Sequence, residues 1–375
     1  MYRKLILPAS LLAATIIGAG IFALPYTFHK AGLVTGLFYL VIFAAVFIII
    51  HLMYADISLR TPGSHRFVGY ASIYLGQAGK WLAILVTVVG MTLVLTVYLV
   101  LSVSFLNFFI PSAPDIQKLL LFWFISSITI FWGINRLAVS EFLITIGISA
   151  IIFVIFIFGF KNFDRFLTEP LFNFNHIVLP YGPILFALAG RTAILAVIDY
   201  FRKNNEPLFS AKKAIILGTF IPALVYLIFV ISIVNLSGRI TEDSVSGLIG
   251  QLPLPLLWLL GILGLIAIWS TYIIIGRDIR KILETDLKFP DLFSRILVFL
   301  APLGLYFAGL KDFLSLIKLT GGVFIGLESI LVILIWRQLQ KQSSESVIFK
   351  KLNPSILYLL LLIFAFGIIL EIIPS

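Results

Sequence analysis

The sequence predicts an all-α integral membrane protein with about eleven transmembrane helices. The chain has 375 residues, of which 61% are hydrophobic and only 12% are charged, whereas soluble domains carry about 25% charged residues. Its apolar residues also gather into stretches of about 20, the length with which an α-helix crosses about 30 Å of hydrocarbon. This composition excludes a soluble enzyme, a disordered chain and a nucleic-acid-binding protein, and it makes the lipid bilayer the expected surroundings.

Eleven stretches have the length and composition of a membrane span. They are residues 5–28, 33–58, 81–109, 117–135, 137–160, 183–201, 212–236, 252–275, 293–310, 313–336 and 354–373. Short polar loops separate them, so residues 1–375 are expected to form a single transmembrane domain. The loops expected on the same side of the membrane as the N-terminus hold far more Lys and Arg than the loops on the opposite side. Basic residues collect in cytoplasmic loops, so we expect a multi-pass protein of the cytoplasmic membrane with its N-terminus inside and its C-terminus outside.

The chain lacks a sequence pattern that would bring metal-binding side chains together. It has no cysteine, and its four histidines are scattered without the spacing of metal ligands. No pair of nucleophile and base stands out either. We therefore expect no metal, no cofactor and no enzymatic activity.

Two of the predicted helices have small residues near their centres. Helix 5–28 contains Gly18-Ala19-Gly20, and helix 183–201 contains Ala189-Gly190. Small residues in membrane helices more often allow close packing than unwinding. Here, however, each cluster lies in the first helix of a five-helix set, 5–160 or 183–336, and the two sets begin on opposite sides of the membrane. This placement predicts a 5+5 inverted repeat with interrupted helices 1 and 6 around a substrate, followed by an additional helix 11 at 354–373.

Five segments, in order along nearly the whole chain, carry a resemblance to a known family. They are TIIGAGIFALPYTFHKAG (15–32), YADISLRTPGSHRFVGYASIYLGQAG (54–79), LPYGPILFALA (179–189), ITEDSVSGL (240–248) and GLKDFLSLIKLTGGVFIGLE (309–328). These segments resemble the amino acid/auxin permease family of the amino acid, polyamine and organocation superfamily. The resemblance implies a leucine-transporter-type fold that works by alternating access, with an amino acid held between helices 1 and 6.

The resemblance also implies which residues contact the substrate. Interrupted helices expose backbone groups, which the bilayer tolerates only where they line a cavity, and a half-helix N-terminus favours a carboxylate. Thr92 and Thr96, four residues apart in helix 3, would line the same cavity unless they only join helices. The expected substrate-binding residues are Thr15, Gly18, Ala19, Gly20, Ile21, Thr92, Thr96, Ala187, Ala189, Gly190, Arg191 and Thr192.

Arg191 falls in the middle of predicted helix 6, where an arginine costs at least ~2.5–3.5 kcal/mol and so must face a cavity or a partner. Its guanidinium either binds a substrate carboxylate, takes the place of a coupling cation, or forms a structural ion pair, for example with Glu141 or Glu328. Both acids are also candidate proton carriers if buried. Glu141 begins its helix, and the helix dipole alone would explain an acid there.

Ser270 and Thr271 are candidate sodium ligands in helix 8. Sodium takes about five or six oxygens, and such hydroxyls more commonly bond to the preceding helical turn. Sodium-coupled animal members of the resembled family have an Asn where this chain has Ala14, and the fixed charge of Arg191 disfavours a nearby Na⁺. The sequence therefore predicts a secondary active amino acid transporter that is coupled to protons or works by exchange, with a sodium symporter as the mechanistic alternative.

An amino acid sensor is the alternative from another functional class. The membrane subunits of spore germinant receptors resemble the same superfamily, and they sense amino acids instead of moving them. A receptor of this kind calls for a partner-binding loop, whereas the longest loops here, around 337–353 and 202–212, are short and basic. The loops therefore favour transport.

Overall fold

The computed structural model describes residues 2–63, 65–131, 137–160, 166, 168–342, 348, 349 and 352–373, and the regular elements in these ranges are helices. Elements named α are α-helices, and those named η are short 3₁₀- or π-helices. In chain order they are η1 (Tyr2–Ile6), α1 (Leu7–Ile16), η2 (Ala19–Ala23), α2 (Leu24–Ala31), α3 (Leu33–Arg60), α4 (Phe67–Ile84), η3 (Leu85–Val89), α5 (Gly90–Leu106), α6 (Asp115–Thr129), α7 (Leu137–Phe160), η4 (Phe174–His176), α9 (Tyr181–Leu188), α10 (Arg191–Lys203), α11 (Leu208–Leu236), η5 (Ser246–Leu248), α12 (Leu254–Lys281), η6 (Ile282–Asp286), α13 (Asp291–Phe307), α14 (Phe313–Lys318), η7 (Leu319–Ile325), α15 (Gly326–Gln342) and α16 (Pro354–Ile372).

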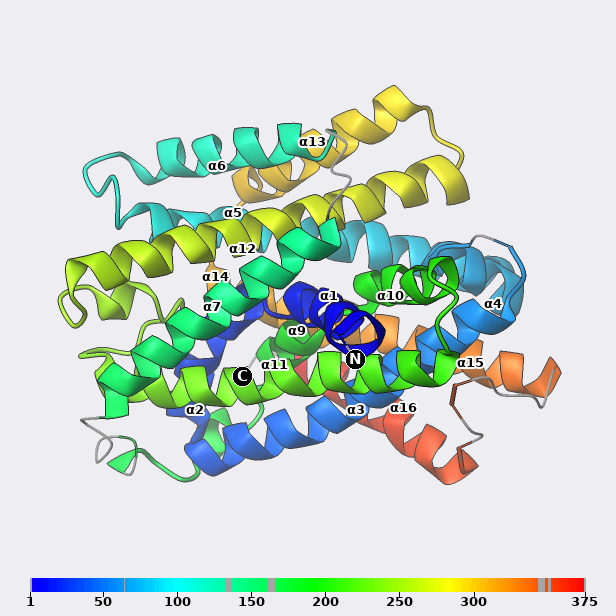
Figure 1. Ribbon diagram of the computed structural model, residues 1–375, viewed down its shortest axis with the longest axis horizontal. Coiled ribbons are helices and arrows are strands. Elements are labelled where there is room, and N and C mark those ends of the chain that lie inside the picture. The colour runs from blue at the N-terminus through cyan, green and yellow to red at the C-terminus, as the bar shows by residue number, and fades with distance from the viewer. Residues whose placement is uncertain are drawn as a thin grey trace.

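The long helices lie side by side in one bundle, with the short helices α1 and α9 near its centre (Figure 1). Helix α11 packs against α1, α7 and α3, and α12 packs against α5 and α7. Helices α6 and α13 form one edge of the bundle in this view, and α3 and α16 form the opposite edge. The interrupted segments are therefore enclosed by complete helices.

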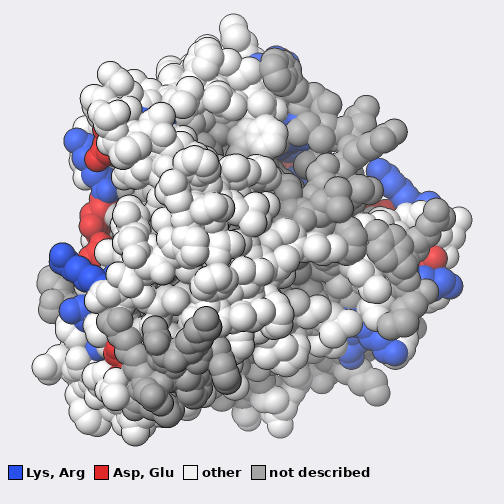
Figure 2. Space-filling view, turned by 60° about the vertical axis from the view of Figure 1, so that its left-hand side comes forward, with Lys and Arg blue, Asp and Glu red and all other residues white. Residues whose placement is uncertain are grey.

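The surface of the bundle suits a bilayer. Within the described residues, seven helices are long and apolar enough to cross a membrane, or up to eight if the bent pair at the N-terminus is one span. Helices α6 and α13 are shorter, with 15 and 17 residues. Figure 2 shows a broad belt of uncharged side chains between two margins that carry the Lys, Arg, Asp and Glu residues. The number of eleven spans stays a prediction.

Two helices near the centre of the bundle are interrupted. Between α1 and η2 the backbone leaves the helical region at Ile17 and Gly18, and the helices on either side are bent by 51°. Between α9 and α10 the same happens at Ala189 and Gly190. Each interruption includes a glycine, Gly18 or Gly190, where the absence of a side chain allows close approach of another group.

Helix α4 is an element that the sequence analysis left as a connection. Its first half is amphipathic, because Phe67, Tyr70, Ala71 and Tyr74 recur at helical spacing and are buried. The helix is kinked at Gly76, whose φ of 69° lies in the left-handed region that glycine adopts without strain. A short amphipathic stretch between two membrane spans is thus folded onto the bundle. Helix α6 ends at Thr129, and residues 132–135 of predicted helix 117–135 lie outside the described residues.

Glycine allows α9 and η7 to meet backbone against backbone. A Cβ added to Gly321 would lie far inside van der Waals contact with the carbonyl oxygen of Gly182. We expect Gly321→Ala to destabilise the folded protein by about 1–3 kcal/mol, as overpacking does. The melting temperature of the purified protein in detergent measures this loss. Gly304→Ala in α13 is the control, because an added Cβ there meets no atom within 4 Å and alanine favours a helix; an equal loss at both positions would contradict the packing argument.

Candidate functional site

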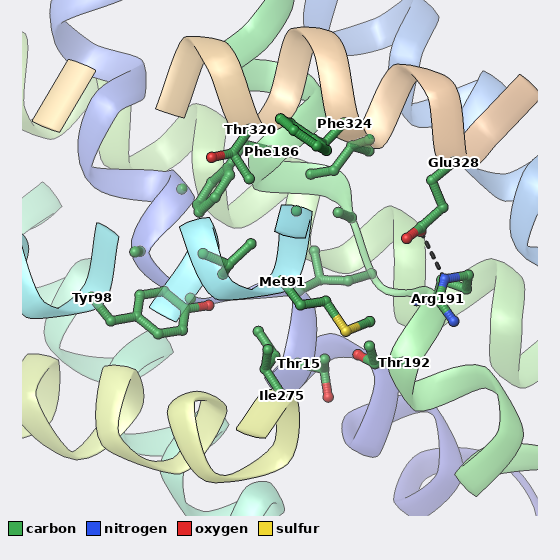
Figure 3. A pocket seen from close by; sticks show the side chains of 18 of the residues that line it. Thr15, Met91, Tyr98, Phe186, Arg191, Thr192, Ile275, Thr320, Phe324 and Glu328 are labelled. Atoms are coloured by element: carbon green, nitrogen blue, oxygen red, sulfur yellow. Dashed lines mark ion pairs between the residues drawn. The ribbon is translucent and has the colours of Figure 1, made fainter. Parts of the chain in front are cut away.

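A cavity of about 70 Å³ lies where the two interruptions meet. Figure 3 shows side chains from several helices converging on it. The lining comes from both interrupted helices and from η3, α5, α12, η7 and α15. The lining residues are Thr15, Ile16, Gly18, Ala19, Gly20, Val86, Gly90, Met91, Val94, Tyr98, Phe186, Ala189, Arg191, Thr192, Ile275, Thr320, Phe324, Ile325 and Glu328.

The hydroxyl of Tyr226 on α11 joins the two interrupted helices. It lies 2.6 Å from the carbonyl oxygen of Ile16, at the end of α1, and 2.8 Å from that of Ala187, near the end of α9. The last carbonyls of a helix lack donors within the helix, and a buried carbonyl without a donor is costly. The single O–H of this fully buried tyrosine is shared between the two carbonyls and ties both helix ends to α11. The carbonyl of Ile16 also accepts from the N–H of Gly18 at 2.8 Å.

Backbone groups at the interruption of helix 1 face the cavity. Ala19, Gly20 and Ile21 open η2, and the first N–H groups of a helix have no acceptor within it. Thr15 belongs to the last turn of α1, whose carbonyls lack intrahelical donors. Anion-binding donors and cation-binding acceptors therefore lie a few residues apart.

One end of the cavity is polar and lies beside this interruption. A Cβ added to Gly18 would be 3.1 Å from the hydroxyl of Tyr98 and 3.8 Å from Oγ1 of Thr271. Two hydroxyls from α5 and α12 thus face the exposed backbone of helix 1. They enlarge the set of hydrogen-bonding groups at this end.

The middle of the cavity is apolar. Met91 lies between the two ends in Figure 3, with Phe186 and Phe324 along one side. Val86 comes from the π-helix η3 and Phe324 from the π-helix η7. Such π-helical turns are frequent at functional sites, where they shift side chains from regular helical positions.

The opposite end of the cavity holds an ion pair. Nε of Arg191 is 2.8 Å from Oε1 of Glu328, and the two side chains are 5% and 15% exposed. The guanidinium also lies over the ring of Phe67, at 4.4 Å from its centroid, and 5.6 Å from that of Tyr54. Of the interpretations given for Arg191, the structure thus shows the ion pair with Glu328.

The pair balances an unfavourable position for a cation. Arg191 is the first residue of α10, where the helix dipole already contributes partial positive charge. Glu328 compensates both the guanidinium and the dipole. The argument that a fixed positive charge repels Na⁺ is weakened, because this charge is neutralised at 2.8 Å.

Most of the predicted binding residues line this cavity, and the others lie beside it or elsewhere. The structure brings Thr15, Gly18, Ala19, Gly20, Ala189, Arg191 and Thr192 to the cavity wall, together with Glu328. Ala187 packs against Gly20, and Gly190 against the side chain of Ile16, so these two small residues let the interrupted helices touch. Ile21 lines a second, smaller apolar cavity.

The two threonines of α5 are bonded to backbone and are absent from the wall of the large cavity. The Thr92 hydroxyl donates to Val88 O at 2.6 Å. That of Thr96 is fully buried and lies 3.0 Å from Thr92 O and 3.2 Å from Pro302 O of α13. Thr96 thus joins α5 to α13, which was the alternative for this pair, whereas Thr92 bonds to the preceding turn of its own helix.

The remaining coupling candidates lie elsewhere. The hydroxyls of Ser270 and Thr271 both donate to Ala267 O, at 3.2 and 3.0 Å, as hydroxyls of membrane helices commonly do. Glu141 belongs to α7, but its side chain lies outside the described residues. No cluster of metal-binding side chains occurs among the residues that the structure describes.

Sequence reasoning missed Tyr98 and Tyr226. Both are buried tyrosines in apolar helices, which nothing in the local sequence distinguishes from core residues. A buried tyrosine nevertheless calls for a partner for its hydroxyl, and that rule would have marked both. It would not have found the helix ends that Tyr226 contacts, 39 and 210 positions away along the chain.

Two solved structures share the overall fold of this chain. The crystal structure of MhsT in complex with L-phenylalanine matches 97% of this chain and 97% of its own, with a TM-score of 0.72 and 15% identity. The structure of Mhp1, a nucleobase-cation-symport-1 family transporter in a closed conformation with bromovinylhydantoin bound, matches 97% of this chain and 89% of its own, with a TM-score of 0.64 and 14% identity. The chain therefore has the leucine-transporter-type fold of membrane transporters. No curated protein matches it in sequence.

The family is shown by the sequence as a whole. The model of the tryptophan/tyrosine permease family matches residues 1–374, and the chain belongs to this family. It is a multi-pass membrane permease and not an enzyme. The resemblance to the amino acid/auxin permease family is right about the kind of protein, but that particular family is not confirmed.

The Tyr226 hydroxyl provides a test of how the interrupted helices are held. Tyr226→Phe removes this shared donor. The carbonyl of Ile16 keeps the N–H of Gly18 at 2.8 Å, so the loss falls mainly on the carbonyl of Ala187 and is about 1–3 kcal/mol for a buried group. We expect a corresponding fall in melting temperature. Tyr272→Phe is the control, because it removes the hydroxyl of another buried tyrosine, which lies 3.1 Å from the Ser127 hydroxyl and not at a helix-end carbonyl. A Tyr226→Phe protein that melts no lower than Tyr272→Phe would show that the helix ends do not need the bridge.

Proposed function

We propose that the protein is a secondary active transporter that moves an aromatic amino acid across the cytoplasmic membrane by alternating access. The observation that carries this proposal is the cavity at the junction of two interrupted helices. Its wall combines exposed backbone groups at one end with a large apolar middle. A free amino acid needs both features, because its charged groups and its side chain differ in polarity.

The backbone at the interruption of helix 1 suits the charged groups of an amino acid. The N–H groups of Ala19, Gly20 and Ile21 are proposed to bind the carboxylate, which the positive end of η2 also favours. The carbonyl of Thr15 is proposed to accept from the ammonium group. In this role the backbone recognises what all amino acids share, and the remainder of the cavity selects the side chain.

The apolar middle supports an aromatic side chain. Met91, Phe186 and Phe324 provide the polarizable and aromatic surface on which a ring packs favourably. The name of the family, which refers to tryptophan and tyrosine, supports the same class of substrate. The complex of MhsT, a protein of the same fold, contains L-phenylalanine.

Further parts of the proposal concern architecture and coupling. We propose that 5–160 and 183–336 are inverted repeats within eleven spans, with the N-terminus in the cytoplasm; labelling of Ser112→Cys by an impermeant reagent from outside tests this orientation. We also propose that transport does not depend on sodium. Ala14 offers no side-chain oxygen, and the Ser270 and Thr271 hydroxyls both bond to Ala267 O.

Gly18→Val tests the site. Its side chain would enter the cavity beside the Tyr98 hydroxyl, where the carboxylate is proposed to bind. Its Cβ would lie 3.1 Å from that hydroxyl and at least 3.8 Å from the next atoms, Thr271 Oγ1 and Thr15 O. Thermal stabilisation by L-tyrosine or L-tryptophan reports binding to the folded state. We expect the affinity derived from it to fall at least tenfold. The melting temperature without substrate should change little.

Gly20→Val is the matched comparison for Gly18→Val. An added Cβ at Gly20 meets the backbone of Ala187, so this variant should melt at a lower temperature even without substrate. Undiminished stabilisation of Gly18→Val by substrate would move the site elsewhere.

Uptake by proteoliposomes tests transport and coupling together. We expect radiolabelled L-tyrosine or L-tryptophan to enter when a pH gradient is imposed and choline replaces sodium, or to exchange against unlabelled substrate inside. Glu328→Gln should abolish gradient-driven uptake if this acid carries the proton, and its melting temperature is the folding check, because the variant leaves Arg191 without its charged partner. Strict dependence on sodium would contradict the proposed coupling, and binding without uptake under every condition would favour the sensor over the transporter.

A further inference from the structure

The Arg191–Glu328 ion pair stands at the far end of the cavity from the group of hydroxyls and backbone atoms around Gly18. Figure 3 shows Tyr98 at one end, the ion pair at the other and Met91 between them. A Cβ on Gly18 would lie 3.1 Å from the Tyr98 hydroxyl, which fixes the interruption of helix 1 at the Tyr98 end. A ligand whose carboxylate binds at that interruption therefore extends its side chain toward the pair.

The pair offers both a donor and an acceptor to such a ligand. Nη2 of Arg191 is buried and has no hydrogen-bond partner among the described residues. Glu328 lines the cavity, is 15% exposed and uses Oε1 toward Arg191. A carboxylate has a second oxygen that accepts hydrogen bonds. A buried donor without a partner is costly until an acceptor arrives, so this end of the cavity is prepared for a polar group.

The charge balance decides what kind of group fits. The Arg191–Glu328 pair is already neutral, so a second carboxylate would leave two negative charges against one guanidinium. A neutral group that both donates and accepts leaves the balance unchanged. The phenol of tyrosine does both, the indole N–H of tryptophan donates only, and the phenyl ring of phenylalanine does neither.

We propose that Arg191 and Glu328 form a specificity subsite that recognises a hydrogen-bonding group at the far edge of an aromatic amino acid. Arg191 Nη2 donates to the phenol oxygen of tyrosine, and Glu328 accepts from the phenol O–H or from the indole N–H of tryptophan. This inference rests on the proposed function, because it assumes that the carboxylate binds at the interruption of helix 1. It distinguishes tyrosine and tryptophan from phenylalanine, which the apolar middle of the cavity alone does not.

The size of the effect follows from hydrogen bonds to charged groups. Such bonds change affinity by on the order of tenfold to a hundredfold, and a site built to bond a hydroxyl discriminates against an analogue that lacks it. 4-Methyl-L-phenylalanine is the appropriate comparison, because it has nearly the size of tyrosine without the hydroxyl. We expect the wild type to bind L-tyrosine at least tenfold more tightly than this analogue.

The test compares a double variant with the wild type. A single substitution leaves one buried charge unpaired and endangers folding, whereas replacing both members of a buried pair by apolar residues is often neutral or stabilising. Affinities of L-tyrosine, 4-methyl-L-phenylalanine and L-phenylalanine are measured with purified Arg191→Met/Glu328→Leu protein, whose folding is checked by its melting temperature. We expect L-phenylalanine to bind about as well as in the wild type and the preference for L-tyrosine to fall to near one.

Tyr98→Phe is the control at the other end of the cavity, and it should weaken all three ligands by a similar factor. An unchanged tyrosine preference in the double variant would overturn the inference and leave the pair as a link between α10 and α15. An equal loss of all three ligands would also overturn it, because the pair would then hold the carboxylate. If the wild type binds none of the three, the proposed function itself fails, which these results distinguish from a failure of the subsite alone.

Discussion

The structure depends on how two broken helices are tolerated inside a membrane protein. Each interruption frees backbone groups that lipid cannot satisfy, and the Tyr226 hydroxyl lies within 2.8 Å of a carbonyl from each. Close contact between Gly20 and Ala187 brings the two interruptions together. The remaining exposed groups face one cavity, and the polar end of that cavity is a result of this constraint.

The sequence identified site residues where a single residue is energetically unfavourable in an apolar membrane helix. An arginine at mid-depth and glycines in the first helix of each set both marked exceptions to an apolar helix, and all of them came to lie at or beside the cavity. The partner of Arg191 was narrowed to two acids because few acids occur inside the spans. Thr92 and Thr96 were predicted to line the cavity, but both hydroxyls bond to backbone carbonyls. The spacing of hydroxyls along a helix is the same whether they face a cavity or pack within the bundle.

The rest of the site depends on contacts that no local pattern encodes. Tyr226 meets both helix ends only after α11 has packed against α1, and Val86 and Phe324 reach the cavity through π-helical turns whose positions the sequence does not announce. Helix α4 was missed because its apolar face is short and lies between two longer spans. A substrate cavity is thus a property of the assembled bundle, even when each half of its most conspicuous ion pair can be found in the sequence.

The backbone contact between Gly182 and Gly321 has a consequence for how the bundle can rearrange. Two helices that touch through their backbones cannot slide along each other without first separating, and the ring of Tyr181 lies over Gly367 in the same way. Helix α9 thus contacts η7 and α16, and α10 packs on α1, while α3 and α11 contact both halves. It follows that a change of backbone angle at Ala189 and Gly190 would turn α10 relative to α9 without breaking the contact between α9 and η7.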